Sequence, residues 1–425
     1  MAVTPPRGMR DFPPSTKRKR ESLLKLMAEV YHLHGFEAIE TPALENSEVL
    51  DSGMGGENEK LSFKILRRGL AASDLVSLKN IDSLSDLGLR FDLTVPLARF
   101  YASNRGKLPQ VFRAFHVGPV WRAEKPQKGR YRQFLQCDID VIGEAGLLAE
   151  LEAIRATADF LARSGLQDFT FRINDRRLLE ELLTKVGIMP KDQPSTMIAL
   201  DKIEKVGIEQ VISDVKTLVS ANFDEAKLRA FLGLSVGKTG LHDVVSELES
   251  FGLSGPTLSG LLELASLAEV SLGADKIRID PSLVRGMGYY TSSIVEISHP
   301  SLGSSLGGGG RYDGMIGKFL GTEVPAFGIS LGFERLTELV EELPPDGPKR
   351  SALVVSPGVE LTTVLAIKQS LVESGEAVRV IRHRKNMRPI YEQLVDDGIF
   401  RVADLRPEMD NIKELSWRNL DDASS

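Results

Sequence analysis

Three arginines in this chain occupy positions suited to chemistry on a phosphorylated substrate. The first, Arg285, begins the segment 285–291, Arg-Gly-Met-Gly-Tyr-Tyr-Thr, which predicts a strand that points the arginine and a tyrosine pair into a ligand pocket. A guanidinium stays charged at any working pH and can stabilise negative charge on a phosphoryl group during its transfer. The alternative is a buried structural arginine that is paired with a carboxylate.

The second arginine, Arg122, belongs to a segment that suits a nucleotide. Residues 120–134 predict two strands joined by a polar loop, with Arg122, Glu124 and Phe134 close together. An arginine can bind a phosphate through two N–H groups, a carboxylate can accept a hydrogen bond from an exocyclic amine, and an aromatic ring can stack on a base. A surface hairpin with salt bridges explains this segment equally well when it is taken alone.

The third arginine, Arg335, follows a glycine-spaced strand at 327–332 and is expected to lie at the start of a helix. Its planar guanidinium could cover one face of an adenine while Phe134 covers the other. The three segments together indicate an enzyme that uses ATP.

A set of smaller polar residues could complete the pocket. Carboxylates in this set could bind an ammonium group, and a tyrosine hydroxyl with a second carboxylate could recognise an imidazole. The set consists of Asp92, Thr94, Gln136, Asp140, Tyr290 and Tyr312. The sequence contains no Cys/His set with zinc spacing, no Ser-His-Asp arrangement and no Gly-x-x-x-x-Gly-Lys loop.

The elements that must position these residues form a mixed α and β pattern. Apolar positions from Leu23 to His34 recur at helical spacing and end at Gly35. Strands are predicted at 36–40, 89–93, 111–115, 120–122 and 134–141. Because the connections between them are too short for regular crossover helices, we expect an antiparallel sheet flanked by helices.

A chain of 425 residues predicts two or three domains. We expect a catalytic core at 1–165 and 276–340, a mainly helical insertion at 166–275, and a proline-rich linker at 341–349. Strands at 352–356, 377–381 and 400–405, with helices at 359–373 and 387–397, predict a small α/β domain over 350–425.

The composition limits the classes of function. The net charge of −6 disfavours indiscriminate binding to nucleic acid, so any such contact must be local, at Lys125 to Arg132 or at Arg379 to Arg388. No apolar run approaches the roughly 20 residues that span a bilayer, so we expect no membrane association. A single cysteine, Cys137, and an N-terminus without an apolar segment favour the cytoplasm.

The order of these segments resembles the class II aminoacyl-tRNA synthetases, and among them the histidyl-tRNA synthetase family. The resemblance rests on Thr41-Pro42, on 122–134, on 328–335, and above all on 285–291, which is similar to that family's histidine-binding signature. The string Lys-Pro-Gln-Lys-Gly-Arg-Tyr-Arg-Gln-Phe-Leu-Gln at 125–136 is very close to its second motif. Residues 1 to about 340 carry the resemblance strongly, and the remainder, which looks shortened and acidic after Arg406, carries it loosely.

The resemblance implies a role for each matching residue. Arg122 and Arg335 would bind ATP, with Glu124 and Phe134 at the adenine, and Arg285 would act with Arg122 in catalysis at the α-phosphate. The histidine site would consist of Asp92 and Thr94 at the α-amino group, with Gln136, Asp140, Tyr289, Tyr290 and Tyr312 around the rest of the substrate. The tRNA acceptor end would meet Lys125, Gln127, Lys128 and Arg130.

The implied reaction is the activation of L-histidine by ATP to histidyl-adenylate, followed by transfer to the terminal ribose of tRNA(His). The resemblance also implies Mg²⁺ on the ATP phosphates, a homodimer, and an anticodon-binding role for the C-terminal domain. Three alternatives remain open: a catalytically silent paralogue that regulates ATP phosphoribosyltransferase, an enzyme that activates histidine for an acceptor other than tRNA, and a domain that only senses histidine.

Overall fold

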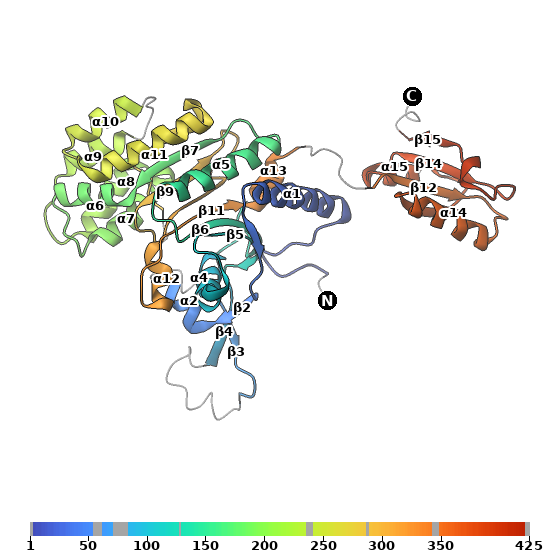
Figure 1. Cartoon of the computed structure of the whole chain (residues 1–425), viewed down its shortest axis with the longest axis horizontal. Helices are drawn as coiled ribbons and strands as arrows, with labels where there is room; N and C mark the ends of the chain where they lie inside the picture. Colours follow the sequence, from blue (N-terminus) through green and yellow to red (C-terminus); the bar gives the residue numbers. More distant parts are fainter. Residues whose placement is uncertain are drawn as a thin grey trace. The chain divides into compact units, whose positions relative to one another are not determined.

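The computed structural model describes residues 3–53, 62–70, 84–126, 129–234, 241–285, 289–341 and 348–420. The chain forms two compact units, the first comprising residues 1–10 and 25–341 and the second residues 11–24 and 342–425. Helix α1 covers Pro14–Leu33 and therefore contributes residues to both units. Figure 1 shows the chain with its elements labelled.

The first unit is built on an eight-stranded sheet. Its strand order is β1-β5-β6-β11-β10-β9-β7-β8. The six strands from β5 to β7 are antiparallel to their neighbours, whereas the outer pairs β1–β5 and β7–β8 are parallel. The strands are β1 Glu37–Ile39, β5 Phe112–Trp121, β6 Gln133–Ile142, β7 Thr170–Asp175, β8 Ile277–Ile279, β9 Ser293–Ser298, β10 Gly307–Arg311 and β11 Ala326–Gly332. The predicted antiparallel core is confirmed.

The first unit also contains a smaller sheet. Its three strands have the order β2-β4-β3 and cover Leu44–Asn46, Ser85–Leu89 and Phe63–Leu66, with α2 at Ser47–Gly53 after β2. The strand predicted at 89–93 is wrong, because β4 ends at Leu89 and α4 begins at Thr94 and runs to Asn104. The carboxylate of Asp92 accepts a hydrogen bond from the backbone N–H of Val95 at 3.2 Å, so Asp92 serves the start of that helix instead.

The two faces of the large sheet differ in what covers them. On one face α5, Leu148–Arg163, packs against β11 and β6, and the side chain of Tyr31 in α1 contacts the rings of Phe115 and Phe160 at centroid distances of 5.2 and 5.8 Å. The other face is apolar only at one end, where α4 and α12, Asp313–Leu320, pack together over Phe112, Ile142 and Ala326. The rest of that second face is polar and open to a cavity.

The remaining helices of the first unit follow β7. Figure 1 shows most of them gathered beside β7 and β9. They are α6 Arg176–Lys185, α7 Gln193–Leu200, α8 Ile203–Leu218, α9 Glu225–Gly233, α10 Leu241–Ser250 and α11 Pro256–Leu272, which is followed by the short η4 Ala274–Lys276. The short elements η3 Arg105–Lys107 and α13 Phe333–Leu339 also belong to this unit.

The second unit contains a four-stranded sheet of order β13-β12-β14-β15, in which the first three strands are parallel and β15 is antiparallel to β14. Its elements are β12 Arg350–Val355, α14 Leu361–Glu373, β13 Ala377–Arg382, α15 Arg388–Asp396, β14 Arg401–Leu405, η5 Ile412–Glu414 and β15 Trp417–Asn419. The strands and helices predicted in this part of the sequence are confirmed, and β15 was not predicted. Two apolar clusters, centred on Leu353 and Leu394, form its core.

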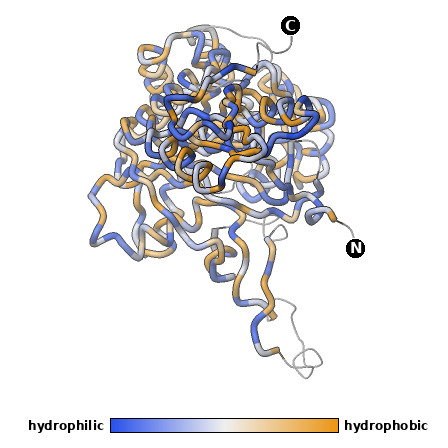
Figure 2. The backbone as a smooth tube through the Cα atoms, turned by 90° about the vertical axis from the view of Figure 1, so that its right-hand side faces the viewer, coloured by the Kyte–Doolittle hydropathy of each residue, from blue (hydrophilic) through white to orange (hydrophobic). Residues whose placement is uncertain are grey.

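Figure 2 shows hydrophobic and hydrophilic residues interspersed along the backbone. Within the described ranges, no helix is both long and apolar enough to cross a membrane.

Candidate active site

Strand β6 supplies one wall of the cavity through a simple alternation. Successive side chains of a strand point to opposite faces, so Phe134, Gln136, Asp138 and Asp140 all lie on the open face of the sheet. Between them, Cys137 and Ile139 face the covered side and are buried. The sequence Phe-Leu-Gln-Cys-Asp-Ile-Asp therefore gives one face of the strand an aromatic ring, an amide and two carboxylates.

Glycines on β10 and β11 leave room above the sheet for these side chains and for Arg285. A Cβ on Gly328 would lie 1.9 Å from Oδ1 of Asp140, and a Cβ on Gly308 would lie 1.9 Å from Nη1 of Arg285. Gly310 stands in the same way under the ring of Tyr290. Close approach of side chains to a backbone requires residues without a Cβ, which explains the run of glycines in this part of the sequence.

The cavity over this face has a volume of about 310 Å³, within the range of small-molecule sites. Four guanidinium groups line it, those of Arg122, Arg130, Arg285 and Arg335. Burial, together with the nearby Arg130 and Arg285, lowers the pKa of Arg335 below its usual value. Several arginines around one cavity create a strong positive potential and suit a polyphosphate.

Arg122 is held by three contacts. Its Nε donates to the carbonyl of Phe91 at 2.9 Å, its Nη2 donates to Oε1 of Gln136 at 3.4 Å, and its guanidinium lies 5.1 Å from the centre of the Phe134 ring. The arginine that contacts Phe134 is thus Arg122, while the guanidinium of Arg335 donates to the backbone carbonyl of Ser305. A base that stacks between Phe134 and Arg335 stays a prediction.

Glu124 also lines the cavity and is paired with Arg130 at 3.6 Å. Arg130, which the resemblance assigns to tRNA, therefore also lines the cavity. Glu334 is a further carboxylate there, and it accepts a hydrogen bond from the backbone N–H of Leu135 at 3.2 Å and pairs with Arg10.

Three buried carboxylates also line the cavity. Asp92, Asp138 and Asp140 are each at most 3% exposed. Burial raises the pKa of Asp92 to about 6. Burial also raises the pKa of Asp138 and of Asp140 above the usual value; Asp92 adds to the rise for Asp138, and Asp138 adds to it for Asp140.

Each of these carboxylates has one oxygen left over. In the part of the chain that the structure describes, no hydrogen-bond donor reaches Oδ2 of Asp92, Oδ1 of Asp138 or Oδ2 of Asp140. Buried polar atoms are normally satisfied, so three orphan acceptors in one cavity indicate a ligand that brings donors. A cationic ligand suits them best, because it would also offset the cost of ionising buried acids.

Tyrosines and an amide fix two of these carboxylates. The hydroxyl of Tyr312 donates to Oδ1 of Asp140 at 2.6 Å, and Nε2 of Gln136 donates to Oδ2 of Asp138 at 2.8 Å. The ring of Tyr289 contacts those of Tyr290 and Tyr312 at centroid distances of 4.8 and 6.2 Å.

The structure brings most of the predicted site residues to one cavity. These are Asp92, Thr94, Arg122, Glu124, Arg130, Phe134, Gln136, Asp140, Arg285, Tyr289, Tyr290, Tyr312 and Arg335. Lys125 lies next to this set in sequence but is not part of the cavity lining, and Gln127 and Lys128 lie outside the described residues. Sequence reasoning missed Asp138, Ser330 and Glu334, although the alternation along β6 points to Asp138.

Comparison with known proteins agrees with this arrangement. The crystal structure of histidyl-tRNA synthetase from Nostoc sp. PCC 7120 is similar with a TM-score of 0.76 at 25% identity and covers 99% of this chain and 96% of that one. An ATP phosphoribosyltransferase regulatory subunit/histidyl-tRNA synthetase from Bacillus halodurans C gives a TM-score of 0.75 at 23% identity over 92% and 96% of the two chains, a likeness that concerns the fold alone. The fold is that of an aminoacyl-tRNA synthetase.

Sequence comparison narrows the class. The family model for histidyl-tRNA synthetase matches residues 8–336. The histidine–tRNA ligase of Leifsonia xyli subsp. xyli is 48% identical over 94% of this chain and 95% of its own, and that of Aeropyrum pernix is 36% identical over 89% and 82%. The chain belongs to the histidyl-tRNA synthetase family.

Proposed function

We propose that this protein is a histidine–tRNA ligase that activates L-histidine with ATP and transfers it to the 3′-terminal ribose of tRNA(His). The observation that carries the proposal is that four arginines and three buried carboxylates line a single cavity. ATP and an amino acid with a second basic group have the complementary charges. The family of the chain agrees with this assignment.

The buried carboxylates and their neighbours in the cavity would bind histidine. Asp92 and Thr94 receive the α-ammonium group, and Asp140 with Tyr312 receives the imidazole, with Gln136, Tyr289 and Tyr290 around them. The supporting observation is the orphan oxygen on each of Asp92 and Asp140, which needs a donor from the substrate. Because the tyrosine hydroxyl already donates to Asp140, an uncharged side chain without N–H donors would leave the second oxygen unsatisfied, which favours imidazole.

The arginines of the cavity, with Phe134 and Glu124, would bind ATP. Phe134 and Glu124 contact the adenine, Arg335 covers it or binds the outer phosphates, and Arg122 and Arg285 lie at the α-phosphate. The histidine carboxylate attacks the α-phosphorus, an oxygen–phosphorus bond forms, and pyrophosphate leaves as the bond to the β-phosphate oxygen breaks. Charge on the equatorial oxygens increases during this step, so fixed guanidinium groups accelerate it without changing their own protonation.

Mg²⁺ would accompany ATP and neutralise its phosphates. This ion is usually bound by phosphates together with one or two carboxylates, so a dedicated protein cage is not required. Within the described residues no cluster of three or more potential metal ligands occurs.

Transfer to tRNA would use the loop between β5 and β6. Lys125 and Arg130, with Gln127 and Lys128, form its basic part and would contact the acceptor end. In the second unit, Arg379, Arg382 and Arg384 line one hollow next to α15 and would meet the anticodon arm. The boundaries of the catalytic core, the helical insertion and the anticodon-binding domain, the homodimer and the cytoplasmic location stay predictions.

The experiment that tests the proposal is charging of total tRNA with labelled histidine by the purified full chain, with ATP and Mg²⁺. We expect acid-precipitable label that requires ATP. Histidine-dependent pyrophosphate exchange without charging would indicate a different acceptor. Histidine binding without exchange would indicate a sensing or regulatory paralogue, and either result would contradict the proposal.

A further inference from the structure

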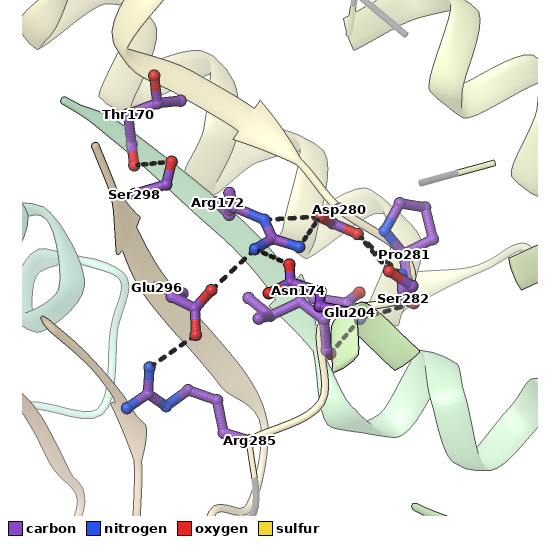
Figure 3. A network of polar contacts seen from close by, with 11 residues as sticks. Thr170, Arg172, Asn174, Glu204, Asp280, Pro281, Ser282, Arg285, Glu296 and Ser298 are labelled. Atoms are coloured by element: carbon purple, nitrogen blue, oxygen red, sulfur yellow. Dashed lines mark hydrogen bonds and ion pairs between the residues drawn. The ribbon is translucent and has the colours of Figure 1, made fainter. Parts of the chain in front are cut away.

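Glu296 lies between two arginines, Arg172 and Arg285. Its Oε1 accepts from Nη1 of Arg172 at 2.8 Å, and its Oε2 lies 3.4 Å from Nη1 of Arg285 (Figure 3). One arginine lines the cavity, whereas the other does not. The carboxylate therefore connects a residue at the reaction centre to a residue outside it.

The sheet register explains why these groups meet. Arg172 of β7 is directly opposite Glu296 of β9, which is directly opposite Gly308 of β10. Residues that are directly opposite have their side chains on the same face and within contact distance. The guanidinium of Arg285 lies over Gly308, so it takes the place that a side chain at position 308 would fill and reaches the next residue in the row.

Arg172 is fixed from its other side. Its Nε and Nη2 contact Oδ2 of Asp280 at 2.7 and 2.5 Å, and Asp280 is 1% exposed and accepts hydrogen bonds from the backbone N–H and hydroxyl of Ser282. Nη1 of Arg172 also contacts Glu204, near the start of α8, at 2.5 Å. Figure 3 shows this network, in which Arg172 contacts both Glu296 and Asp280.

The two distances at Glu296 differ in a way that matters for catalysis. The shorter contact tethers the carboxylate to Arg172 and keeps it from closing on Arg285. Burial raises the pKa of Glu296 and the two arginines oppose that rise, with Glu204 and Asp280 as the other charged groups nearby. An arginine that must stabilise a phosphoryl group needs an aimed guanidinium whose charge is not already neutralised.

We propose that Glu296 is a positioning residue that aims Arg285 across Gly308, and that Arg172 limits how tightly Glu296 holds Arg285. This inference rests on the proposed function, because the aimed group acts on the α-phosphate of ATP. Glu204 and Asp280 both bind Arg172, so Glu204 of the helical region after β7 contributes to the geometry of the reaction centre through a side chain that does not line the cavity.

Histidine-dependent ATP–pyrophosphate exchange in single and double variants tests the proposal. In Arg172→Gln, Glu296 loses its closer partner and closes on Arg285, so we expect kcat to fall about tenfold with the KM for histidine within about twofold. Glu296→Gln removes the charge but keeps an acceptor, and we expect a smaller loss of about threefold. The double variant should recover to the level of Glu296→Gln, because the competing charge is gone.

A merely structural role predicts a different pattern. Losses in the two single variants would then add or worsen in the double variant and would follow the melting temperature. Glu152→Gln is the matched control, because it removes the charge of a carboxylate paired with Arg113 at 2.8 Å on the covered side of the sheet. It should leave kcat unchanged.

Arg172→Lys keeps the charge opposite Glu296 and serves if Arg172→Gln does not fold. We expect Arg172→Lys to retain kcat within about threefold. An active wild-type protein whose double variant shows no recovery, or whose Glu296→Gln variant is indistinguishable from wild type, overturns this proposal alone. A wild-type protein without exchange overturns the proposed function as well.

Discussion

Asp140 of β6 and Tyr312, which directly precedes α12, are joined by a 2.6 Å hydrogen bond between buried groups. The tyrosine hydroxyl occupies Oδ1 of the carboxylate, and Oδ2 remains without a donor among the described residues. The pair is therefore oriented but incomplete. It offers one acceptor, at a fixed position, to whatever enters the cavity.

Asp140→Asn tests the role of this pair. The amide keeps the size of the side chain and an acceptor for Tyr312 but loses the negative charge toward the imidazole. We expect the KM for histidine in pyrophosphate exchange to rise about 100-fold while the KM for ATP changes less than about twofold. A variant with an unchanged KM for histidine would remove Asp140 from the substrate site.

Gly328→Ala tests the same subsite through the backbone. The new methyl group would lie 1.9 Å from Oδ1 of Asp140, so the carboxylate must move. We expect a KM for histidine raised about tenfold or more, in a folded protein. Gly314→Ala in α12 is the matched control, because nothing lies within 4 Å of its added methyl group, and it should behave as wild type. Equal effects in the two variants would contradict the assignment.

Phe134→Leu tests the adenine subsite. The ring lies on the open face of β6 with the guanidinium of Arg122 at 5.1 Å from its centre. Stacking on a base is worth about 1–3 kcal/mol, so we expect the KM for ATP to rise about tenfold. The KM for histidine in the same assay is the internal control and should stay within about twofold. A rise in the KM for histidine alone would place the Phe134 ring at the histidine subsite and contradict its assignment to adenine.

Arg285→Ala tests the catalytic step. Loss of a preorganised positive group at a transition state costs about 100-fold to 1,000-fold in kcat, and we expect exchange to fall by at least that factor. The fold should be retained, as measured by circular dichroism and melting temperature. Arg113→Ala, on the covered side of the sheet, removes a guanidinium that is paired with Glu152 away from the cavity and should remain active. Wild-type exchange by Arg285→Ala would remove the proposed mechanism.

Asp92→Asn tests how much the ionisation of a buried carboxylate in the substrate-free cavity lowers the stability of the fold. Burial raises the pKa of Asp92 to about 6 in the folded chain, against the usual value of 3.8. A raised pKa means that Asp92 favours folding most below pH 4 and that this contribution is lost as the pH rises through about 6. A shift of this size corresponds to about 3 kcal/mol.

The ligand-free Asp92→Asn variant should therefore melt several degrees above wild type at pH 8, and the difference should shrink at pH 5. Asparagine keeps the acceptor for the N–H of Val95, so the start of α4 is preserved. The exposed Asp86 supplies a control, and Asp86→Asn should change the melting temperature little at either pH. An equal gain at both pH values would show that the pKa of Asp92 is not raised.

Local patterns in the sequence were enough to predict the antiparallel core, the first helix and the α/β order of the second unit. Alternation and helical spacing are local signals, so they survive without a structure. Strand 89–93 was predicted wrongly because Leu-Arg-Phe-Asp-Leu has strand-like composition, whereas the carboxylate of Asp92 reaches forward to Val95 and begins a helix.

The candidate site was predictable to the extent that its residues carry family motifs. Asp138 was missed because its neighbours Gln136 and Asp140 matched those motifs and it did not, although it shares their face of β6. Glu296 was missed because its importance depends on which strands are adjacent. Strand β7 is far from β9 and β10 in sequence, and only the sheet order places Arg172, Glu296 and Gly308 in one row.

The central claim is that one cavity selects histidine and joins it to the α-phosphate of ATP. Exchange of labelled pyrophosphate into ATP, measured with each of the twenty amino acids in turn and without tRNA, tests it most directly. The account predicts rapid exchange with histidine and none above background with the other nineteen. Exchange with a different amino acid, or with none, would contradict it.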